Sequence, residues 1–253
     1  MISFFFKPSY FLGPEGKPEK WVLQRVTSRI RGEEIAEYLG AKYNPKKGYE
    51  TDVCIYIKSC KHDQIRDGDY VDVLDDLWMV RWLRDKPKVK VIAMSLSHVD
   101  YLKNLLTNQI VYIPHHHVNF ERLVRIRKEI TTVGYIGAAQ TIKKVEGFEF
   151  ICQTNFKTRQ DILDFYNKID IQIIGDVPDT PYYHPTKIIN AMSFGIPTIS
   201  PTKQAYREVE GFYFQDIKQL KDGWDADKLI KEAEKYHISN IAKLYEKIDS
   251  KSD

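Results

Sequence analysis

Short apolar runs alternate with amphipathic stretches along almost the whole chain. The runs are continuous rather than alternating, which is typical of strands covered on both faces. We predict ten strands in two groups of five, at residues 2–6, 53–57, 70–74, 90–94 and 110–113, then 132–136, 148–152, 169–174, 196–200 and 212–214. The 3.6-residue period predicts helices at residues 19–39, 76–83, 98–106, 159–167, 186–194, 203–209, 226–236 and 239–248.

Strands that alternate with helices predict an α/β fold with parallel sheets and right-handed crossovers. Two groups of strands predict two Rossmann-like, doubly wound domains, an N-terminal domain over residues 1–118 and a C-terminal domain over residues 119–253. The break falls in the polar, basic segment at residues 115–129. Open parallel sheets bind ligands at the carboxyl ends of their strands, so we expect the functional residues in the loops there.

Composition narrows the class of protein. The net charge of the 253 residues is only +3, which is too weak to indicate nucleic acid as the main partner. Three cysteines, Cys54, Cys60 and Cys152, have no CxxC spacing, which argues against a disulfide framework and a structural zinc site. We therefore expect a cytoplasmic protein. The first apolar run ends at Lys7, and no run approaches the roughly 18 apolar residues of a membrane span.

The most informative segment is residues 183–201, which read YHPTKIINAMSFGIPTISP. A residue before proline disfavours helix, so the helix is predicted to begin with Thr186 as its N-cap and to close at Gly195. The amino end of a helix presents free N–H groups and a partial positive charge, to which Lys187 adds a full charge. Thr186 and Lys187 are therefore predicted to bind a diphosphate.

This segment resembles the donor-binding helix of GT-B glycosyltransferases, which reads roughly K-x-x-E-A-M-A-x-G-x-P-V-I. The matching positions are Lys187, Asn190, Ala191, Met192, Gly195, Pro197 and Ile199. Residues 132–137, TVGYIG, are similar to the first strand and glycine turn of the family's donor domain, and residues 111–119, VYIPHHHVN, to the strand before it. The resemblance covers about residues 90–215. It implies a cleft between the two domains, a UDP- or GDP-sugar as donor, and an enzyme that needs no metal or other cofactor.

Two departures from the family pattern bear on mechanism. Asn190 replaces the glutamate that binds the nucleotide ribose in retaining members, although an amide still bonds a hydroxyl. Tyr182 stands where those members have the first of two glutamates eight residues apart, and it cannot act as a carboxylate. The usual sugar contact is then missing, or is moved to Asp179 or His184. The alternative is a helix–strand junction that only packs, as in any Rossmann-like domain.

Two other loops are candidates for donor contact. Gly137 follows the strand at 132–136 and lets the backbone approach a phosphate, and Lys143 is placed to neutralise its charge. A solvated lysine pair, Lys143 and Lys144, is the alternative. Asn155, with Gln153, follows the next strand, where GT-B proteins often receive the base; an ordinary turn is the alternative for this loop and the one the sequence favours.

The first half offers an acceptor side. Gly13 and Gly16, in FLGPEGK, form the candidate acceptor or cleft loop, with a plain surface loop as the alternative. The helix that follows has an apolar stripe, and we predict that its basic residues face outward. That basic face is either simply solvated or makes weak peripheral contact with the inner membrane face through Lys20, Arg25 and Arg29.

Asp76 and His98 are the candidate catalytic bases. Each follows a predicted strand, and an inverting transferase needs a group that deprotonates the acceptor hydroxyl. Capping of the next helix is the alternative role for Asp76. His115, His116 and His117 leave a strand in alternating directions and cannot all face one ion, so no metal site is predicted.

Together these features predict a glycosyltransferase that moves a sugar from a nucleotide-diphosphate-sugar to a hydroxyl of a glycan, lipid-linked or other acceptor. The leaving diphosphate gains negative charge, which a helix amino end and a lysine stabilise without a metal. Retaining and inverting chemistry both stay open. A nucleotide-sugar epimerase and a non-catalytic nucleotide-sugar-binding module are the alternatives; Tyr182 and Asn190 favour the module, and Lys187 opposes it.

Overall fold

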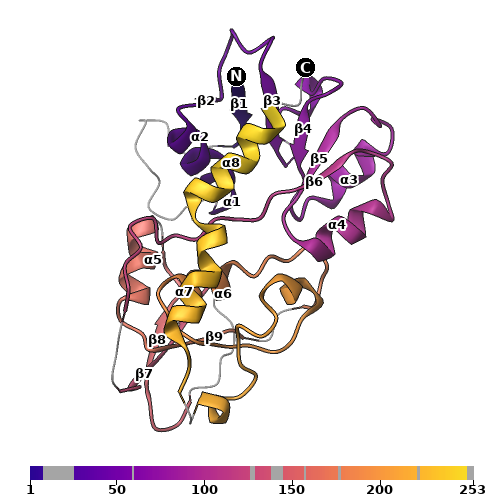
Figure 1. The fold of residues 1–253 in the computed structure, drawn as a ribbon. Coiled ribbons are helices and arrows are strands. Elements are labelled where there is room, and N and C mark those ends of the chain that lie inside the picture. Colours follow the sequence, from indigo (N-terminus) through magenta and orange to yellow (C-terminus); the bar gives the residue numbers. More distant parts are fainter. Residues whose placement is uncertain are drawn as a thin grey trace. The chain divides into compact units, whose positions relative to one another are not determined.

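Two separate parallel sheets organise the chain. The structure is a computed structural model, and it describes residues 1–7, 26–58, 60–125, 129–137, 145–156, 158–175, 178–220 and 223–249. The chain divides into two units, each containing one sheet (Figure 1). Unit 1 comprises Met1–His115, Thr180–His184 and Ile238–Asp253; unit 2 comprises His116–Asp179 and Pro185–His237. The predicted mixed α/β class with parallel sheets is confirmed.

Unit 1 contains, within its described residues, a six-stranded sheet in the order β2-β1-β3-β4-β5-β6. Every neighbouring pair is parallel. The strands are β1 (Ile2–Phe5), β2 (Lys42–Tyr43), β3 (Val53–Ile57), β4 (Tyr70–Asp72), β5 (Lys90–Ala93) and β6 (Ile110–Tyr112). Five of them match predicted strands. The edge strand β2 was not predicted, because two polar residues give no apolar signal.

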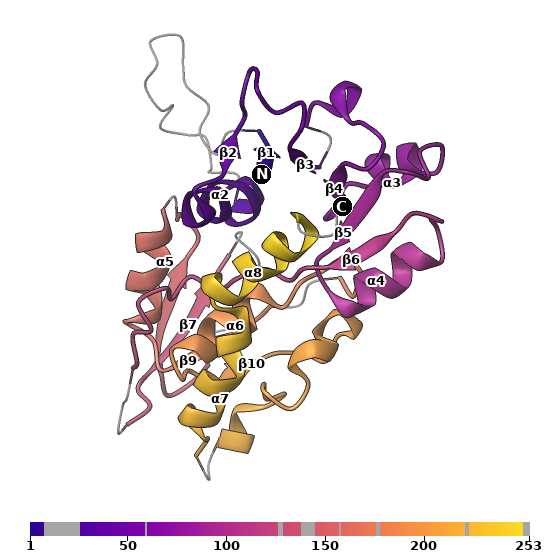
Figure 2. The ribbon, with the colours of Figure 1, turned by 45° about the horizontal axis from the view of Figure 1, so that its top comes forward.

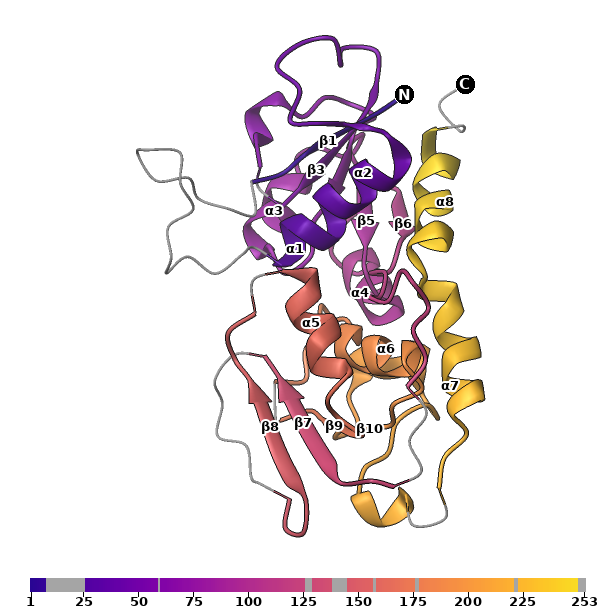
Figure 3. The same cartoon turned by 90° about the vertical axis from the view of Figure 1, so that its left-hand side faces the viewer.

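The described helices of unit 1 cover both faces of this sheet. They are α1 (Val26–Ser28), a π-helical turn η1 (Arg29–Glu33), α2 (Glu34–Leu39), a 3₁₀ turn η2 (His62–Gln64), α3 (Leu77–Leu83), α4 (Leu96–Lys103) and α8 (Ile238–Asp249). Figure 3 shows α3 and α8 on opposite sides of the strands. The core agrees: Phe5 packs with Met79 of α3, whereas the ring of Phe4 meets Tyr245 of α8 at 5.5 Å.

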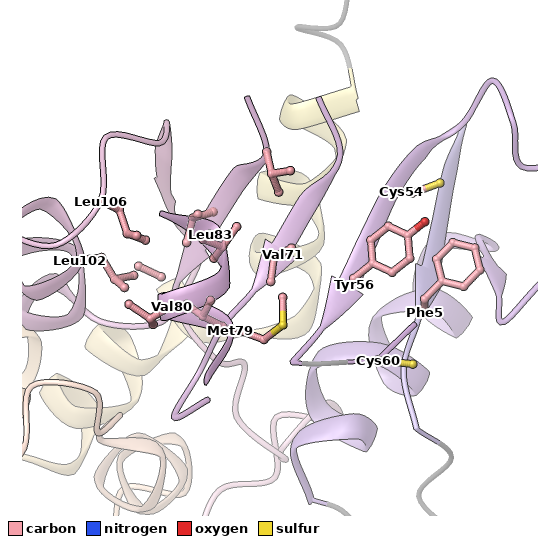
Figure 4. Packing of buried hydrophobic residues seen from close by; sticks show 14 residues of the cluster. Phe5, Cys54, Tyr56, Cys60, Val71, Met79, Val80, Leu83, Leu102 and Leu106 are labelled. Carbon is pink, nitrogen blue, oxygen red and sulfur yellow. The ribbon is translucent and has the colours of Figure 1, made fainter. Parts of the chain in front are cut away.

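The core between the sheet and the helices α3 and α4 is mostly aliphatic and aromatic. Figure 4 shows Tyr56, Val71 and Leu102 among its members, with side chains from β3, β4 and α4 gathered on one face of the sheet. Burial of this kind contributes about 1.5–3 kcal/mol for each large apolar side chain. The continuous apolar runs that predicted these strands are explained by this packing on both faces.

The π-helical turn η1 changes the predicted exposure of the first helix. Arg29 is only 5% exposed, and its Nε lies 3.3 Å from Glu34 Oε1. The prediction that Arg29 faces outward to a membrane was therefore wrong. A π turn spreads its residues over a wider turn than an α-helix, so the four-residue spacing used to assign the outward face fails there. Lys20 and Arg25 lie outside the described residues.

Unit 2 contains a four-stranded parallel sheet in the order β10-β9-β7-β8, again within its described residues. The strands are β7 (Thr132–Ile136), β8 (Glu149–Gln153), β9 (Ile171–Ile173) and β10 (Thr198–Ile199). The predicted fifth strand at 212–214 is reduced to one bridge between Ile199 and Phe214. The described helices are α5 (Arg159–Tyr166), α6 (Thr186–Ser193), α7 (Ala226–Ala233) and the 3₁₀ turns η3 (Gln204–Val209), η4 (Ile217–Leu220) and η5 (Glu234–Tyr236).

Both faces of the sheet in unit 2 are buried. Ile136 packs with residues of α5 and α6 on one face, while Val133 and Tyr135 face a second cluster on the other. The stacked rings of Tyr166 and Phe194, 5.1 Å apart, join α5 to the end of α6. Figure 2 shows α6 beside α7, and the buried residues of the two helices share one core cluster. This packing fixes α6 against the sheet.

Candidate functional site

Helix α6 lies in the segment 183–201, which the sequence predicts to bind a diphosphate. Its N-cap is Pro185 rather than the predicted Thr186, which is the first helical residue, and no side chain caps the helix. Proline has no N–H to donate to a preceding turn, but its carbonyl can accept the first hydrogen bond of the helix. Ile189 N donates to Pro185 O at 3.0 Å. The helix ends as predicted, with Gly195 in the left-handed conformation (φ 70°) just after the C-cap.

The Lys187 side chain reaches the end of the first strand of unit 2. Its Nζ lies 5.0 Å from the centroid of the Tyr135 ring. A Cβ added to Gly137, directly after β7, would lie only 2.5 Å from that Nζ and 2.9 Å from the Tyr135 hydroxyl. Gly137 adopts φ 150°, a conformation that side chains rarely allow. The structure thus brings together Gly137 and Lys187, two of the predicted donor-binding residues, at the carboxyl end of β7.

Lys187 forms no ion pair with any described residue. Burial lowers the pKa of its ammonium group, because a charge in a low-dielectric site is disfavoured. No carboxylate among the described residues pairs with it, and its ammonium group lies over the face of the Tyr135 ring. A half-buried ammonium group without a counter-ion, next to a helix amino end, is suited to bind an anion.

A buried network supports the first turn of α6. The Tyr166 hydroxyl donates to Gln172 Oε1 at 2.5 Å and also lies 3.2 Å from the carbonyl oxygen of Lys187. Gln172 lies on β9 and is fully buried. The backbone of Lys187 is therefore held by α5 and the central strands, so that its side chain starts from a rigid position.

The Asn190 side chain already has a buried partner in the structure. Its Oδ1 accepts a hydrogen bond from Val118 N at 3.0 Å, and the residue is 6% exposed. A buried amide oxygen that already has a partner gains nothing from turning to a ribose. In the structure Asn190 therefore anchors the segment before β7 instead of presenting its oxygen to a ligand.

The remaining donor candidates are not gathered around Lys187 by any contact among the described residues. Asn155 is exposed after β8, and its carbonyl accepts from Gln153 Nε2 at 2.7 Å. Lys143 lies outside the described residues. Asp179, a candidate for the displaced sugar contact, accepts from Gln204 N at 3.1 Å.

Asp76, the first candidate base in unit 1, caps helix α3. Its Oδ1 accepts from Met79 N at 3.2 Å. This is the alternative role that the sequence left open, and a cap of this kind contributes about 1 kcal/mol. Leu74, two residues before Asp76, has φ 52°, which is an uncommon conformation for a bulky side chain.

His98, the second candidate base, is fully buried on α4. Met94 N donates to its Nδ1 at 3.4 Å, and burial together with the nearby Arg31 guanidinium lowers the pKa of the imidazole to about 4. The ring is therefore neutral near neutral pH, and its basic nitrogen is already occupied by a backbone donor. Such a histidine is a poor proton acceptor.

Sequence reasoning missed an ion pair in unit 1. Arg31 Nε donates to Asp72 Oδ2 at 2.5 Å, and the two side chains are 1% and 0% exposed. Arg31 Nη1 also donates to the carbonyls of Ile113 and Pro114 at 2.8 Å each. The pair joins η1 to the carboxyl ends of β4 and β6. An apolar–polar pattern assigns arginine to the surface, and Glu33 and Glu34 are closer acids in the sequence, so no local signal points to Asp72.

The other candidates from the sequence can be placed briefly. Gly13 and Gly16 lie outside the described residues. The rings of His115 and His184 stack at 4.5 Å in unit 1, and Tyr182 meets Tyr101 edge-on at 6.0 Å. The described residues contain no group of histidine, cysteine and acidic side chains placed to hold a metal. None of the described helices is both long and apolar enough to cross a bilayer.

Comparison with known proteins finds similar folds. No protein-family model matches the chain, and no curated protein matches its sequence. The crystal structure of Anabaena Alr3699/HepE in complex with UDP and glucose superposes with a TM-score of 0.51 at 10% identity, over 79% of this chain and 72% of that one. The structure of accessory secretory protein 1, 2 and 3 in Streptococcus pneumoniae gives a TM-score of 0.51 at 11% identity, over 95% of this chain and 66% of that one. At such identities the likeness shows a shared fold.

Proposed function

We propose that this chain is a GT-B-type protein that binds a nucleotide-diphosphate-sugar through Lys187 and the amino end of α6, and transfers the sugar to a hydroxyl acceptor. The observation that carries the proposal is the half-buried Lys187 ammonium, which has no counter-ion among the described residues and lies beside Gly137 at the carboxyl end of β7. UDP and glucose in the structure of Alr3699/HepE, which shares the fold, support it.

The proposed chemistry follows from charge. In a glycosyl transfer the bond between the sugar and the diphosphate breaks, and negative charge develops on the leaving diphosphate. The Lys187 ammonium and the N–H groups of the first turn of α6 stabilise that charge. Gly137 admits the phosphates because its backbone carries no side chain in front of Lys187. The N-terminal acceptor half, residues 1–118, the donor half, residues 119–253, and the cleft between them stay predictions, as does the cytoplasmic location.

A second candidate is a module that binds a nucleotide-sugar without turning it over. Two observations favour it: the Asn190 oxygen is engaged by Val118 N, and Tyr182 packs against Tyr101. Neither position then supplies the sugar contact of the retaining family members. In addition, the Asp76 carboxylate and the His98 imidazole are engaged within unit 1. Binding and catalysis therefore need separate tests.

The test of binding is a thermal-shift screen of UDP-, GDP-, CMP- and dTDP-sugars. A ligand that binds only the folded protein raises its stability by mass action. We expect one nucleotide class to raise the Tm, and Lys187→Ala to reduce that shift. Lys168→Ala, which removes an exposed lysine of the same unit, is the matched control and should leave the shift unchanged. The donor proposal fails if no nucleotide-sugar raises the Tm at millimolar concentration.

The nucleotide class found in this way then decides between an enzyme and a module. Release of nucleoside diphosphate from the donor, with a panel of glycan and lipid-linked acceptors, reports transfer. Epimer formed from the donor alone would identify an epimerase. Tight binding with no product across the panel would support the module.

A further inference from the structure

Helix α3 presents an exposed surface that the donor site does not use. Leu77 is 44% exposed and Trp78 is 49% exposed, so two adjacent large apolar side chains face solvent. Arg81, Arg84 and Lys86 are also exposed, on the same helix and just after it. We call these five residues the α3 surface. Apolar and cationic side chains interleaved on one exposed helix need a partner that satisfies both.

The cations of the α3 surface are not neutralised within unit 1. None of Arg81, Arg84 and Lys86 forms an ion pair with a described residue, whereas Lys88 nearby pairs with Asp67 at 3.4 Å. Residues 77–90 contain five basic side chains and one acidic side chain, Asp85. The surface therefore carries a local excess of positive charge.

Aromatic rings extend the apolar part of this surface. His62 meets the ring of Trp78 edge-on at 4.9 Å and that of Trp82 at 6.5 Å. The ammonium group of Lys86 lies 5.8 Å from the centroid of the Trp82 ring. The indole rings are thus held in place while one of them, Trp78, keeps about half of its area in solvent.

The orientation of α3 is fixed by the buried side chains on the side opposite to the exposed ones. Met79, Val80 and Leu83 are buried in the core of unit 1 and point toward the sheet and α4 in Figure 4. Rotating α3 to hide Leu77 and Trp78 would expose these three side chains, at a cost of several kcal/mol. The α3 surface is therefore a permanent feature of unit 1.

We propose that the α3 surface docks unit 1 on an anionic lipid bilayer, with Leu77 and Trp78 entering the interface and Arg81, Arg84 and Lys86 contacting lipid phosphates. Tryptophan favours the bilayer interface, and each basic residue near an anionic surface contributes attraction. This inference does not depend on the donor site, and it places the membrane contact on α3 rather than on the helix around Arg29.

A bilayer accounts for the surface better than a soluble polyanion does. Arginine and lysine bind either one, and an indole can stack on either one. Leu77, however, has no polar atom in its side chain, and an aliphatic group gains free energy only by leaving water for an apolar phase. Its exposure beside the cations points to a partner with both phosphate and hydrocarbon.

The experiment is sedimentation of the full chain with vesicles of phosphatidylcholine alone, and of equal parts phosphatidylcholine and phosphatidylglycerol. We expect binding only to the anionic vesicles, with a blue shift of tryptophan emission that Trp78→Phe reduces. Arg81→Gln/Arg84→Gln should weaken partitioning roughly twenty-five-fold, since each basic residue near the surface contributes about a factor of five. Leu77→Ala/Trp78→Ala should abolish the part of binding that survives high salt.

Matched variants keep the result interpretable. Lys46→Gln/Lys47→Gln removes the same charge from an exposed turn of unit 1 and should leave vesicle binding nearly unchanged. Equal loss in both pairs would overturn the proposal, because net charge alone would then explain binding. Retention on heparin that is insensitive to Leu77→Ala, without vesicle binding, would overturn it in favour of a soluble polyanion. The nucleotide-induced Tm shift should be the same in all these variants, so failure here is separate from failure of the donor site.

Discussion

A single methyl group at Gly137 tests the geometry around Lys187. In Gly137→Ala the new Cβ would lie 2.5 Å from Lys187 Nζ, about 1 Å closer than a normal contact between non-bonded heavy atoms. The ammonium must therefore move away from the end of β7. Two separate costs follow: the strain of a side chain at φ 150°, and the loss of the ligand contacts that the displaced Lys187 would have made.

The two costs affect different measured quantities. Backbone strain of this kind lowers the free energy of unfolding by about 1–3 kcal/mol. Loss of a charge-assisted hydrogen bond to a phosphate costs about 1.5–3 kcal/mol of binding, or roughly ten- to a hundredfold in Kd. At a ligand concentration one hundred times Kd, wild-type protein gains about 2.7 kcal/mol of stability from the ligand. A hundredfold weaker Kd leaves about 0.4 kcal/mol of that gain.

The assay is urea unfolding with and without the nucleotide-sugar found in the thermal-shift screen. Gly147→Ala is the control, because Gly147 has φ 83° and nothing within 4 Å of an added Cβ. It shares the backbone strain but leaves Lys187 untouched. If Gly137→Ala loses no more ligand-induced stabilisation than Gly147→Ala, the reasoning about Lys187 is refuted.

Three further predictions concern unit 1. Arg31→Met should lower the free energy of unfolding in urea by about 3–5 kcal/mol, because it leaves a buried carboxylate unpaired. The double variant Arg31→Met/Asp72→Leu should recover part of that loss. If both variants lose the same free energy of unfolding, the charge pair is not the cause. Asp76→Ala should lower stability by about 0.5–2 kcal/mol, the cost of a lost helix cap, and leave the nucleotide-induced Tm shift intact. Burial depresses the pKa of His98 to about 4 from an ordinary 6.5, so the unfolded chain binds more protons between these values and stability falls as pH drops through that window. The free energy of unfolding should therefore change less between about pH 7 and pH 5 in His98→Gln than in the wild-type protein, by up to about 1.4 kcal/mol per pH unit. Part of the pH dependence should remain in the variant, because burial also lowers the pKa of His117, to about 3.

Periodicity was enough to predict most of the fold. The apolar runs that became β1, β3, β4, β5, β7 and β9 are buried on both faces, so their pattern reflects packing against neighbours on each side. Periodicity failed to predict elements of only two residues and side-chain positions that depend on the type of helical turn. Lys42 and Tyr43 form a strand only because β1 lies beside them, and the π turn at Arg29 moves the basic side chains inward.

Sequence alone predicted the site residues that lie at the end of a single recognisable element. It did not predict contacts between residues that are far apart in the sequence. Lys187 and Gly137 were found because each sits at the end of a recognisable element. The burial of Asn190 depends on Val118 N, which no local pattern reveals. The same holds for Tyr135, whose ring face contacts the lysine from another strand, and for the pairing of Arg31 with Asp72.

The return of the chain to unit 1 has a consequence for synthesis. The ring of Phe4, in the first strand, packs against Tyr245 of α8, near the opposite end of the printed sequence. A ribosome therefore releases β1 long before the helix that covers it, and all of unit 2 emerges in between. At about 5–20 residues per second, the part of the sheet that α8 covers stays exposed for roughly ten to fifty seconds. We expect this nascent chain to be a chaperone client until its final turns have left the exit tunnel.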